Sequence, residues 1–227
     1  MKLSRAERTR EALLNAGYDL MLDRSFDAVA IDELIAMAGV GKGSFFNHFG
    51  DKEGFKAAVA MQVRGEIEAQ VTRANCALSD PLERLAGGMR EVVRYAIDNR
   101  SRTVAVLRMS VGATERDYPL NEGLRADLDA CVAAGLVRPE AKQGGLLYWL
   151  GLCTVLMTHF VEHSVPVEES AQKLHDIMFL GLTGLGANEP KAEEISARSA
   201  IQLKESLVAS RRRLSRTSCK KAGESKR

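Results

Sequence analysis

The stretch from Ala30 to Phe49, AIDELIAMAGVGKGSFFNHF, limits the possible folds of this chain more than any other. Leu34 and Ala38 recur at the spacing of one helix face before Gly39 interrupts the pattern. Glycine adopts without strain the positive φ that ends a helix, so a second helix can begin at Val40. Two short helices joined by one tight turn make a helix-turn-helix. The sequence therefore predicts a helical N-terminal domain.

The second helix of this motif is expected to have a packed side and an exposed side. Val40 and Phe45 are the apolar residues that would hold it against the body. The residues expected to face outward are Lys42, Gly43, Ser44, Phe46, Asn47 and His48. Ammonium, hydroxyl, amide and imidazole groups on one exposed helix face suit the phosphates and base edges of a DNA major groove. This face is therefore a candidate DNA-binding surface.

The motif belongs to a longer run with a specific order of residues. Its segments are Phe26-Asp27, Ile31-Asp32-Glu33-Leu34-Ile35, Ala38-Gly39-Val40, Gly43-Ser44-Phe45-Phe46-Asn47-His48-Phe49 and Asp51-Lys52-Glu53. Over roughly residues 4–60 the chain resembles the TetR-like (tetracycline-repressor-like) family of bacterial transcription regulators. The resemblance implies an all-α fold in which a three-helix DNA-binding domain, residues 1–52, is joined by a long fourth helix to a larger domain. Residues 53–187 would form this helical effector-binding and dimerisation domain.

Several positions depart from the family pattern. Ala30 stands where the family has a threonine or serine helix cap, and Gly41 stands where it has a serine. Phe46 replaces the common tyrosine, so a hydroxyl that could bond a phosphate is missing. Ile35 occupies the position of a small alanine, and Gly43 is expected to make room for it.

The charge distribution gives the DNA-binding prediction only limited support. The chain of 227 residues carries a net charge of +2. Residues 198–227 hold ten Lys/Arg and two Glu, a net +8, so residues 1–197 carry −6. Residues 1–52 hold seven Lys/Arg and eight Asp/Glu. Affinity for DNA would therefore depend on where each cation is placed, with Arg5 in the N-terminal arm and Lys52 at the start of the fourth helix as candidates.

Composition favours a soluble, cytoplasmic, all-helical protein. Hydrophobic residues make up 45% of the chain and there are only five prolines. No signal peptide is recognisable, and the longest apolar run, Gly144 to Val161, contains Thr154 and His159, so no membrane span is expected.

No metal site, cofactor or enzymatic activity is expected. His159 and His163 have a spacing that can bind zinc, but only Glu162 is a nearby carboxylate. The four cysteines show no paired ligand spacing and are expected to be reduced and structural. The alternative is that Cys131 or Cys153 senses oxidants or electrophiles, which requires a lowered thiol pKa.

Caps and apolar periodicity predict the remaining helices. Asp51 caps the fourth helix, which should continue to about Leu78, and Asp80-Pro81 opens a fifth that runs to about Asn99. Further helices are expected at about 101–112, 120–134, 141–163, 168–186 and 192–214. Residues 188–227 would comprise this last helix and a basic tail, from Arg211 on, that is expected to be disordered.

The helices at 141–163 and 168–186 are apolar over most of their circumference, which indicates burial on more than one side. In the TetR-like family the corresponding two helices form the dimer interface. The residues predicted to lie in it are Leu150, Leu156, Phe160, Leu174, Ile177, Met178, Gly181 and Leu182. Packing inside one monomer is the alternative explanation for the same pattern.

The middle helices of the larger domain resemble the effector pocket of the family. The candidates for its lining are Met61, Met89, Tyr95, Met109, Trp149, Cys153 and His159, although such residues at helical spacing can equally form plain core. They fit a mainly apolar small molecule.

The predicted function is that of a homodimeric repressor that an effector releases from a double-stranded, near-palindromic DNA operator. Lys42 and Lys52 would hold phosphates, Ser44 and Asn47 would reach base edges, and Phe46 would pack on a sugar or a thymine methyl. His48 would bond a phosphate or brace the helix. The alternative is a helical ligand-binding or interaction protein of the same fold without specific DNA binding.

Overall fold

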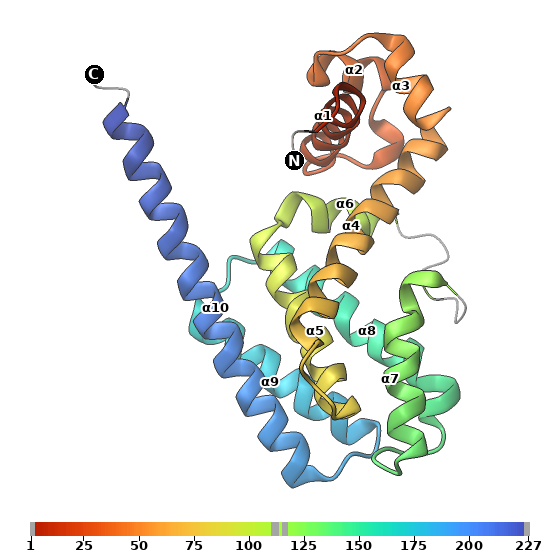
Figure 1. Cartoon of the computed structure of the whole chain (residues 1–227), viewed down its shortest axis with the longest axis vertical. Helices are drawn as coiled ribbons and strands as arrows, with labels where there is room; N and C mark the ends of the chain where they lie inside the picture. Colours follow the sequence, from red (N-terminus) through yellow and green to blue (C-terminus); the bar gives the residue numbers. More distant parts are fainter. Residues whose placement is uncertain (1–2, 110–113, 115–117, 225–227) are drawn as a thin grey trace.

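The computed structural model describes residues 3–109, Thr114 and 118–224, with side chains up to Arg212. All regular structure within these ranges is helical, as predicted (Figure 1). The helices are α1 (Arg5–Leu20), η1 (Phe26–Ala28), α2 (Ile31–Ala38), α3 (Lys42–Phe49), α4 (Lys52–Asn75), α5 (Pro81–Asp98), α6 (Arg100–Met109), η2 (Pro119–Asn121), α7 (Glu122–Ala133), α8 (Ala141–Glu162), α9 (Val167–Gly184) and α10 (Glu189–Glu224).

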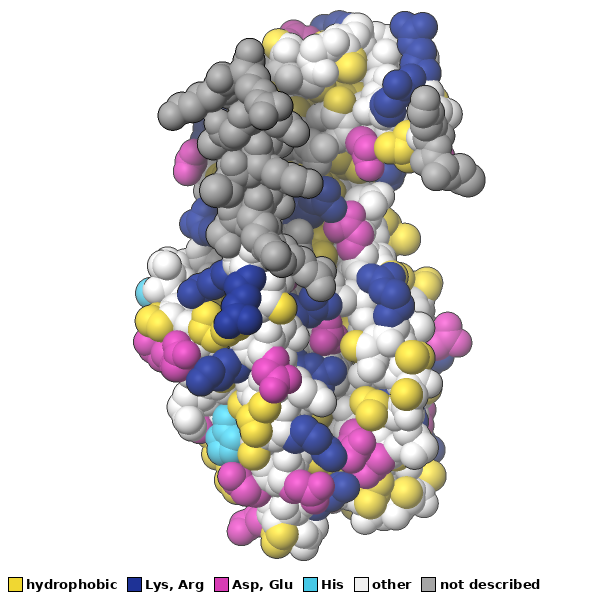
Figure 2. All heavy atoms as spheres, turned by 60° about the vertical axis from the view of Figure 1, so that its left-hand side comes forward, with side chains coloured by type: hydrophobic (Ala, Val, Ile, Leu, Met, Phe, Trp, Pro, Cys, Tyr) yellow, Lys and Arg dark blue, Asp and Glu magenta, His cyan; other side chains and the backbone are white. Residues whose placement is uncertain are grey.

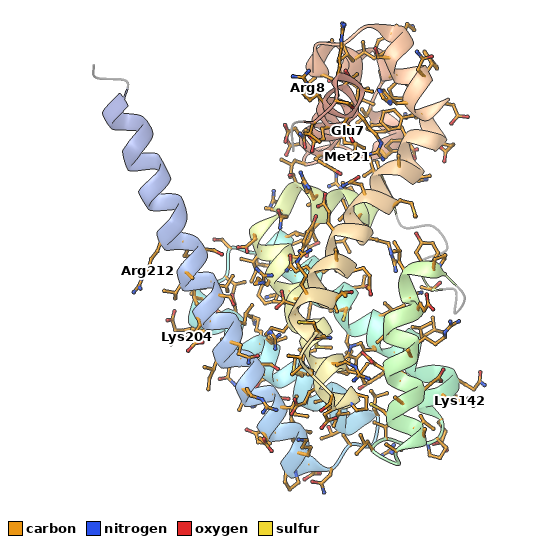
Figure 3. The ribbon with its side chains drawn as sticks, viewed as in Figure 1. Glu7, Arg8, Met21, Lys142, Lys204 and Arg212 are labelled. Atoms are coloured by element: carbon orange, nitrogen blue, oxygen red, sulfur yellow. The ribbon has the colours of Figure 1, made fainter. Side chains whose placement is uncertain are left out.

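The first helix is the platform of the small N-terminal domain. Ser4 and Glu7 form a capping box in which the Glu7 carboxylate accepts from the Ser4 N–H at 2.7 Å and the Ser4 hydroxyl accepts from the Glu7 N–H at 3.1 Å. Figure 3 shows Glu7 and Arg8 on this helix and Met21 where it ends. Leu13 and Met21 are fully buried beneath α2 and α3. The helix-turn-helix therefore rests on a fixed base.

The fourth helix connects the two parts of the molecule (Figure 1). Asp51 caps it by accepting from the Gly54 N–H at 2.7 Å. Its 24 residues span about 36 Å at 1.5 Å per residue. It ends at Asn75 instead of near Leu78, and a turn follows in which the Leu78 N–H donates to the Asn75 carbonyl at 2.9 Å.

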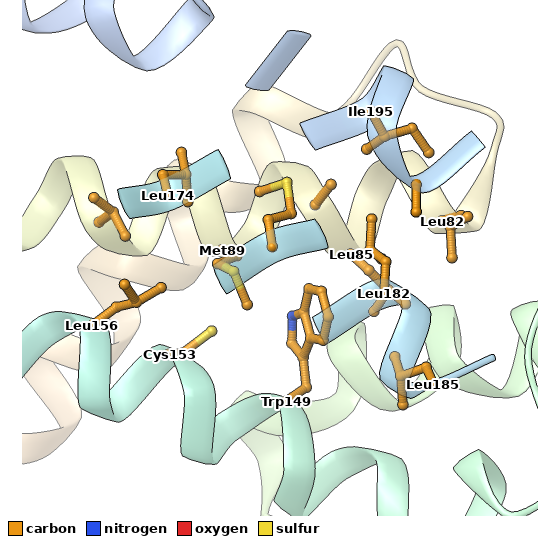
Figure 4. Packing of buried hydrophobic residues seen from close by; sticks show 14 of the residues in the cluster. Leu82, Leu85, Met89, Trp149, Cys153, Leu156, Leu174, Leu182, Leu185 and Ile195 are labelled. Atoms are coloured by element: carbon orange, nitrogen blue, oxygen red, sulfur yellow. The ribbon is translucent and has the colours of Figure 1, made fainter. Parts of the chain in front are cut away.

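The fifth helix lies at the centre of the larger domain and packs against every helix from α4 to α10. It begins as predicted, since the Asp80 carboxylate accepts from the Leu82 N–H at 2.9 Å and Pro81 occupies the first turn. Figure 4 shows Leu85 and Met89 of α5 packed against side chains from α8 and α9.

The tenth helix is longer than predicted, and the expectation of a disordered tail from Arg211 is wrong up to Glu224. No proline interrupts residues 191–224, and the arginine, lysine and alanine content of the segment favours helix continuation. Its Ile195, Leu203 and Leu207 are buried against α9 and α5. The helix thus belongs to the core of the larger domain, while residues 225–227 lie outside the description.

The dimerisation prediction is corrected for most of its residues. Leu156, Phe160, Leu174, Met178, Gly181 and Leu182 are buried within the monomer. Leu150 and Ile177 are partly buried and pack against the same core. The physical reason is that α10 covers one side of α9 and α5 covers another, so a helix that is apolar all round finds most of its partners inside its own chain.

The eighth helix is, among the described helices, the one long and apolar enough to cross a membrane by length and composition alone. The core helices of soluble proteins meet the same criterion. In this chain its Trp149, Cys153 and Leu156 face Met89 and Leu174 in the core (Figure 4).

Candidate DNA-binding surface and ligand cavity

The turn of the helix-turn-helix has the geometry that the sequence predicts. Gly39 ends α2 with φ 65° and ψ 34°, in the left-handed region that favours glycine. Its N–H donates to the Ala36 and Ile35 carbonyls, and the Val40 N–H donates to the Ile35 carbonyl at 3.2 Å. These bonds satisfy the last carbonyls of α2 and set the direction in which α3 starts.

An aromatic cluster holds α3 in place. Phe45 is fully buried, with its ring centroid 5.5 Å from that of Phe49 and 5.6 Å from that of Phe55 on α4. Phe49 and Phe55 meet edge to face at 4.9 Å, and Phe26 stacks on Phe55 at 6.4 Å. The cluster joins η1, α3 and α4, so α3 is oriented by the fourth helix as well as by the turn.

The opposite side of α3 is open to solvent. Lys42, Gly43, Phe46 and Asn47 are exposed, whereas Ser44 and His48 are half-buried. Phe46 keeps 42% of its surface exposed and packs edge to face on Phe45 at 5.5 Å. Phe46 is therefore accessible to another molecule together with its exposed neighbours Lys42 and Asn47.

Gly43 does not make room for Ile35, so this packing prediction is wrong. A Cβ atom built at Gly43 would meet nothing within 4 Å. The glycine lies on the solvent side of α3, where the absence of a side chain lets another molecule approach the backbone closely.

Lys42 is exposed and loosely held. Its ammonium donates to the Asp32 carboxylate at 2.9 Å, and the two side chains are 64% and 76% exposed. Exposed pairs of this kind contribute little to stability. A phosphate could therefore replace Asp32 as the partner at small cost.

Lys52 has a structural contact that the sequence did not indicate. Its ammonium donates to the Asp27 carbonyl at 2.9 Å and lies 5.0 Å from the centroid of the Phe26 ring. The lysine thus ties the start of α4 to η1, and any contact with a phosphate would have to be made by its remaining N–H groups.

The basic side chains of the N-terminal domain are few and individually placed. Arg5 is exposed in the first turn of α1, and Arg10 lies over the Phe49 ring at 5.9 Å. Figure 2 shows basic and acidic side chains mixed over the face around α10. Because residues 1–52 hold seven Lys/Arg and eight Asp/Glu, individual cations near α3 must supply the attraction to phosphate.

The larger domain contains a partly open cavity of about 570 Å³, within the range of small-molecule sites. It lies between α4, α5, α7 and α8. The apolar residues that line it include Ile67, Val71, Leu85, Val92, Val106, Leu107, Leu120, Leu124, Trp149, Leu150, Cys153 and Met157. Such a cavity can hold a compact, largely apolar molecule.

Two of the seven residues predicted to bind an effector, Trp149 and Cys153, line this cavity. The other five are absent from its lining. Met61 is 52% exposed at the surface, Met89, Tyr95 and Met109 are buried in the cores, and His159 stacks on His163 at 4.8 Å. Helical spacing could not separate these core positions from lining positions, because both are apolar and face inward.

The sequence prediction missed the polar wall of the cavity. Arg64 and Glu68 of α4, with Arg84 of α5 and Asp127 of α7, line it. The Arg84 Nε donates to the Asp127 carboxylate at 2.6 Å. Burial raises the pKa of Asp127, and the bond from Arg84 opposes that rise. The available signal was the placement of Arg64 and Glu68 immediately after Val63 and Ile67, where charges border the apolar stripe of α4.

A polar network beside the cavity joins α4 to the helices around it. The Glu66 carboxylate accepts from Tyr95 of α5 at 2.6 Å, from Arg102 of α6 at 2.6 Å and from Gln62 at 3.0 Å. Gln62 in turn accepts from Arg10 of α1 at 3.1 Å. A shift of α4 would therefore be felt in the N-terminal domain through bonded side chains as well as through the helix itself.

The thiols do not have the properties of a sensor. Cys131 and Cys153 are buried, and burial raises the pKa of each to about 12. The alternative that either one senses oxidants required a lowered pKa and is therefore contradicted. No group of three or more His, Cys, Asp or Glu residues that could hold a metal occurs in the described part of the chain.

Comparisons with known proteins agree with this architecture. Residues 13–59 match the family described as "Bacterial regulatory proteins, tetR family". The HTH-type transcriptional repressor NemR of Escherichia coli (strain K12) is 45% identical over 51 residues, which are 22% of this chain and 26% of NemR. The Transposon Tn10 TetC protein of Escherichia coli is 24% identical over 167 residues, 73% of this chain and 84% of TetC. The match to NemR thus spans about a quarter of that protein.

Among solved structures, a gamma-butyrolactone receptor (ArpA like protein) has the same fold, with a TM-score of 0.63 and 19% identity over 89% of this chain and 99% of that one. The structure is thus that of an all-helical protein whose N-terminal domain presents a helix-turn-helix. Residues 13–59 therefore form the N-terminal domain characteristic of the tetR family of bacterial regulatory proteins.

Proposed function

We propose that this protein is a cytoplasmic, homodimeric transcription repressor that binds a near-palindromic double-stranded operator and is released by a small molecule. The observation that carries the proposal is the open face of α3, which presents Lys42, Phe46 and Asn47 on a helix fixed by the Gly39 turn and the Phe45 cluster. The family that residues 13–59 match consists of bacterial regulatory proteins, and the relative NemR is named a repressor.

On DNA, α3 would enter the major groove with its exposed side toward the bases. Asn47 and Ser44 would bond base edges. Lys42 would exchange its contact with Asp32 for one with a phosphate. Phe46 would pack on a sugar or a thymine methyl, and Gly43 allows the closest approach of the backbone. Half-buried His48 would bond a phosphate or brace the helix. Arg5 would follow the phosphate backbone from the first turn of α1.

Dimerisation would use α8 and α9, as the sequence predicts, but through their solvent-exposed sides. The residues first predicted to form the interface lie on the sides that face the core. Leu147, Tyr148 and Val155 on α8 and Leu180 on α9 are exposed by 55%, 40%, 67% and 60%. The Tyr148 hydroxyl donates to the Leu180 carbonyl at 3.3 Å, so these side chains form one continuous apolar face across the two helices. A second copy of the chain is the partner that covers it in this proposal. The pair would place two α3 helices about one DNA turn, 34–36 Å, apart.

Release would proceed through α4. The cavity and the Glu66 network both involve this helix, and the Phe55 ring near its start packs against Phe45 of α3. A molecule that binds more tightly when α4 is displaced would shift the protein toward the DNA-free conformation. The size of the shift is set by the difference between its affinities for the displaced and undisplaced conformations.

The test is selection of bound duplexes from a random DNA pool at near-physiological salt, with the wild type and the Lys42→Ala/Asn47→Ala variant in parallel. We expect a near-palindromic consensus from the wild type and its loss in the variant. Equal, salt-sensitive binding by both proteins, or no enrichment, would favour a helical ligand-binding protein without specific DNA binding. A Lys142→Ala variant, on the far domain, is the control for general loss of charge.

A further inference from the structure

Two charges of opposite sign face the cavity from one side of α4. Arg64 and Glu68 are four residues apart, which places them one above the other on the helix, and both line the cavity. Neither forms an ion pair in the part of the chain that the structure describes. An arginine and a glutamate four residues apart on a helix can pair only weakly, so their other neighbours decide where each side chain lies.

Neighbours at the start of α7 hold Arg64 away from Glu68. The Arg64 Nη2 donates to the Asn121 Oδ1 at 2.7 Å, and the guanidinium lies 4.7 Å from the centroid of the Tyr118 ring. Both partners are uncharged. The remaining N–H groups of Arg64 therefore keep a positive charge at the cavity wall without a carboxylate to neutralise it directly.

Glu68 has even fewer partners. Within the described residues no hydrogen bond reaches its carboxylate. The Glu68 Oε1 lies close against Gly123, since a Cβ atom built on that glycine would be 2.9 Å from it. Burial raises the pKa of Glu68, Arg64 opposes this, and Asp127 adds to it. A half-buried carboxylate without a donor is unfavourable, and a ligand that supplied a donor would remove this cost.

The rest of the cavity offers little other polar recognition. The Arg84 guanidinium is already bonded to Asp127 at 2.6 Å and to the Ser79 carbonyl at 2.9 Å. The Asn75 amide nitrogen donates to the Arg84 carbonyl, whereas its Oδ1 is buried without a hydrogen-bond partner among the described residues and lies close against Gly87, 2.1 Å from where a Cβ atom would be. Apolar side chains from α5, α6 and α8 form the other walls. Unsatisfied polar groups in the lining are thus the neutral Asn75 Oδ1, the remaining N–H groups of Arg64 and the Glu68 carboxylate, and of these only Arg64 and Glu68 carry charge.

From this arrangement we infer that the cavity selects an apolar molecule whose polar head carries a hydrogen-bond acceptor for Arg64 and, beside it, a hydrogen-bond donor for Glu68. The inference rests on the proposed function in treating the cavity as the effector site. It specifies the chemical class of the ligand, which neither the fold nor the apolar lining does. The polar head would sit between α4 and the start of α7, with the apolar body toward Trp149.

The experiment uses Trp149, the single tryptophan of the chain, as the reporter, because its buried ring lines the cavity. Its fluorescence is titrated with four probes that share a phenylpropyl body: n-propylbenzene, 3-phenylpropylamine, 3-phenylpropionate and phenylalanine. We expect phenylalanine, which carries both groups, to bind at least about ten-fold more tightly than n-propylbenzene, because each charged hydrogen bond is worth about that factor.

Two variants assign the head groups. Glu68→Gln should remove the advantage given by the amine, and Arg64→Gln the advantage given by the carboxylate. Glu53→Gln, an exposed glutamate near the start of the same helix, should change neither. Equal affinity for all four probes in the wild type, or no saturable response to phenylalanine, would overturn the inference without recourse to the variants.

The outcome is separable from that of the operator selection. Discrimination among the probes by a protein that selects no DNA would uphold the cavity's ligand class and remove the regulator assignment. Operator selection by a protein that does not distinguish the probes would uphold the regulator assignment and remove the inferred ligand class.

Discussion

Gly39 and Gly43 have the same empty surroundings but different backbone conformations. A Cβ atom at either would meet nothing within 4 Å, yet only Gly39 has a positive φ, 65°. Gly39→Ala should therefore lower the free energy of unfolding by about 1–2 kcal/mol, because an L-residue is strained in the left-handed region. Urea denaturation followed by circular dichroism measures the change.

Gly43→Ala is the matched control, because α3 already has helical dihedral angles there and alanine favours a helix. Its free energy of unfolding should be unchanged or raised by up to about 1 kcal/mol. If both variants lost stability equally, crowding around the motif would explain the loss and the turn geometry would not.

The cysteines should differ sharply in reactivity. Cys76 is exposed, whereas Cys131 and Cys153 are buried with pKa values raised to about 12. Only a minute fraction of either buried thiol is ionised near pH 8, and access is blocked as well. Iodoacetamide should therefore alkylate Cys76 in the native protein and spare Cys131 and Cys153, and peptide mass spectrometry measures the modification of each. Alkylation of Cys153 at the rate of Cys76 would mean that the cavity opens further to solvent.

At the scale of elements, the Glu66 network should make the contact between α4, α5 and α6 depend on pH. Burial alone would raise the pKa of Glu66, but bonds from Tyr95, Gln62 and Arg102 outweigh it and hold the pKa below its ordinary value of 4.5. A carboxylate with a depressed folded-state pKa stabilises the protein above the unfolded-state pKa, and this stability is lost as pH falls through the folded-state value.

Glu66→Gln should accordingly cost about 1–3 kcal/mol of unfolding free energy at pH 7, and the difference from wild type should shrink below about pH 4.5. Urea denaturation across pH 7 to pH 3.5 gives both values. Glu53→Gln, whose side chain is 76% exposed, should give no such pH-dependent difference. A constant difference across the pH range would mean that shape, not charge, holds the network together.

Helix starts and ends were predicted correctly where they depend on residues within one turn of the chain. The Gly39 turn, the Asp51 cap and the Asp80-Pro81 start lie where the sequence predicts them, since caps and positive φ depend on a few neighbouring residues. The chain past Arg211 was misjudged, because a basic, polar composition does not prevent a helix that Leu203 and Leu207 already anchor to the core.

The side of a helix that faces the core was harder to predict than the position of the helix in the sequence. Leu156 and Val155 are adjacent and similar, yet one is 4% and the other 67% exposed. On a helix that is apolar all round, periodicity cannot tell which side meets the core, and only the positions of α5, α9 and α10 decide it. The cavity wall was missed for a related reason. Arg64 and Glu68 look like ordinary surface charges until α7 is seen to lie over them.

At the scale of the whole molecule, the exposed face of α8 and α9 determines whether one chain can act alone. Val155 is the most exposed of its large apolar residues, at 67%. If this face is the dimer interface, Val155→Glu would bury two unpaired carboxylates near the symmetry axis and should give a monomer by sedimentation equilibrium.

Ile201→Glu provides the comparison, because Ile201 is also a large exposed apolar residue, at 59%, but lies on α10. It should leave the dimer intact and operator affinity unchanged, whereas the Val155→Glu monomer should lose most of its affinity, because one chain can hold only one half-site. A dimer that survives Val155→Glu and dissociates with Ile201→Glu would place the interface on α10. The spacing of the two recognition helices would then be set by α10, and the half-site separation recovered by DNA selection would have to match that different geometry.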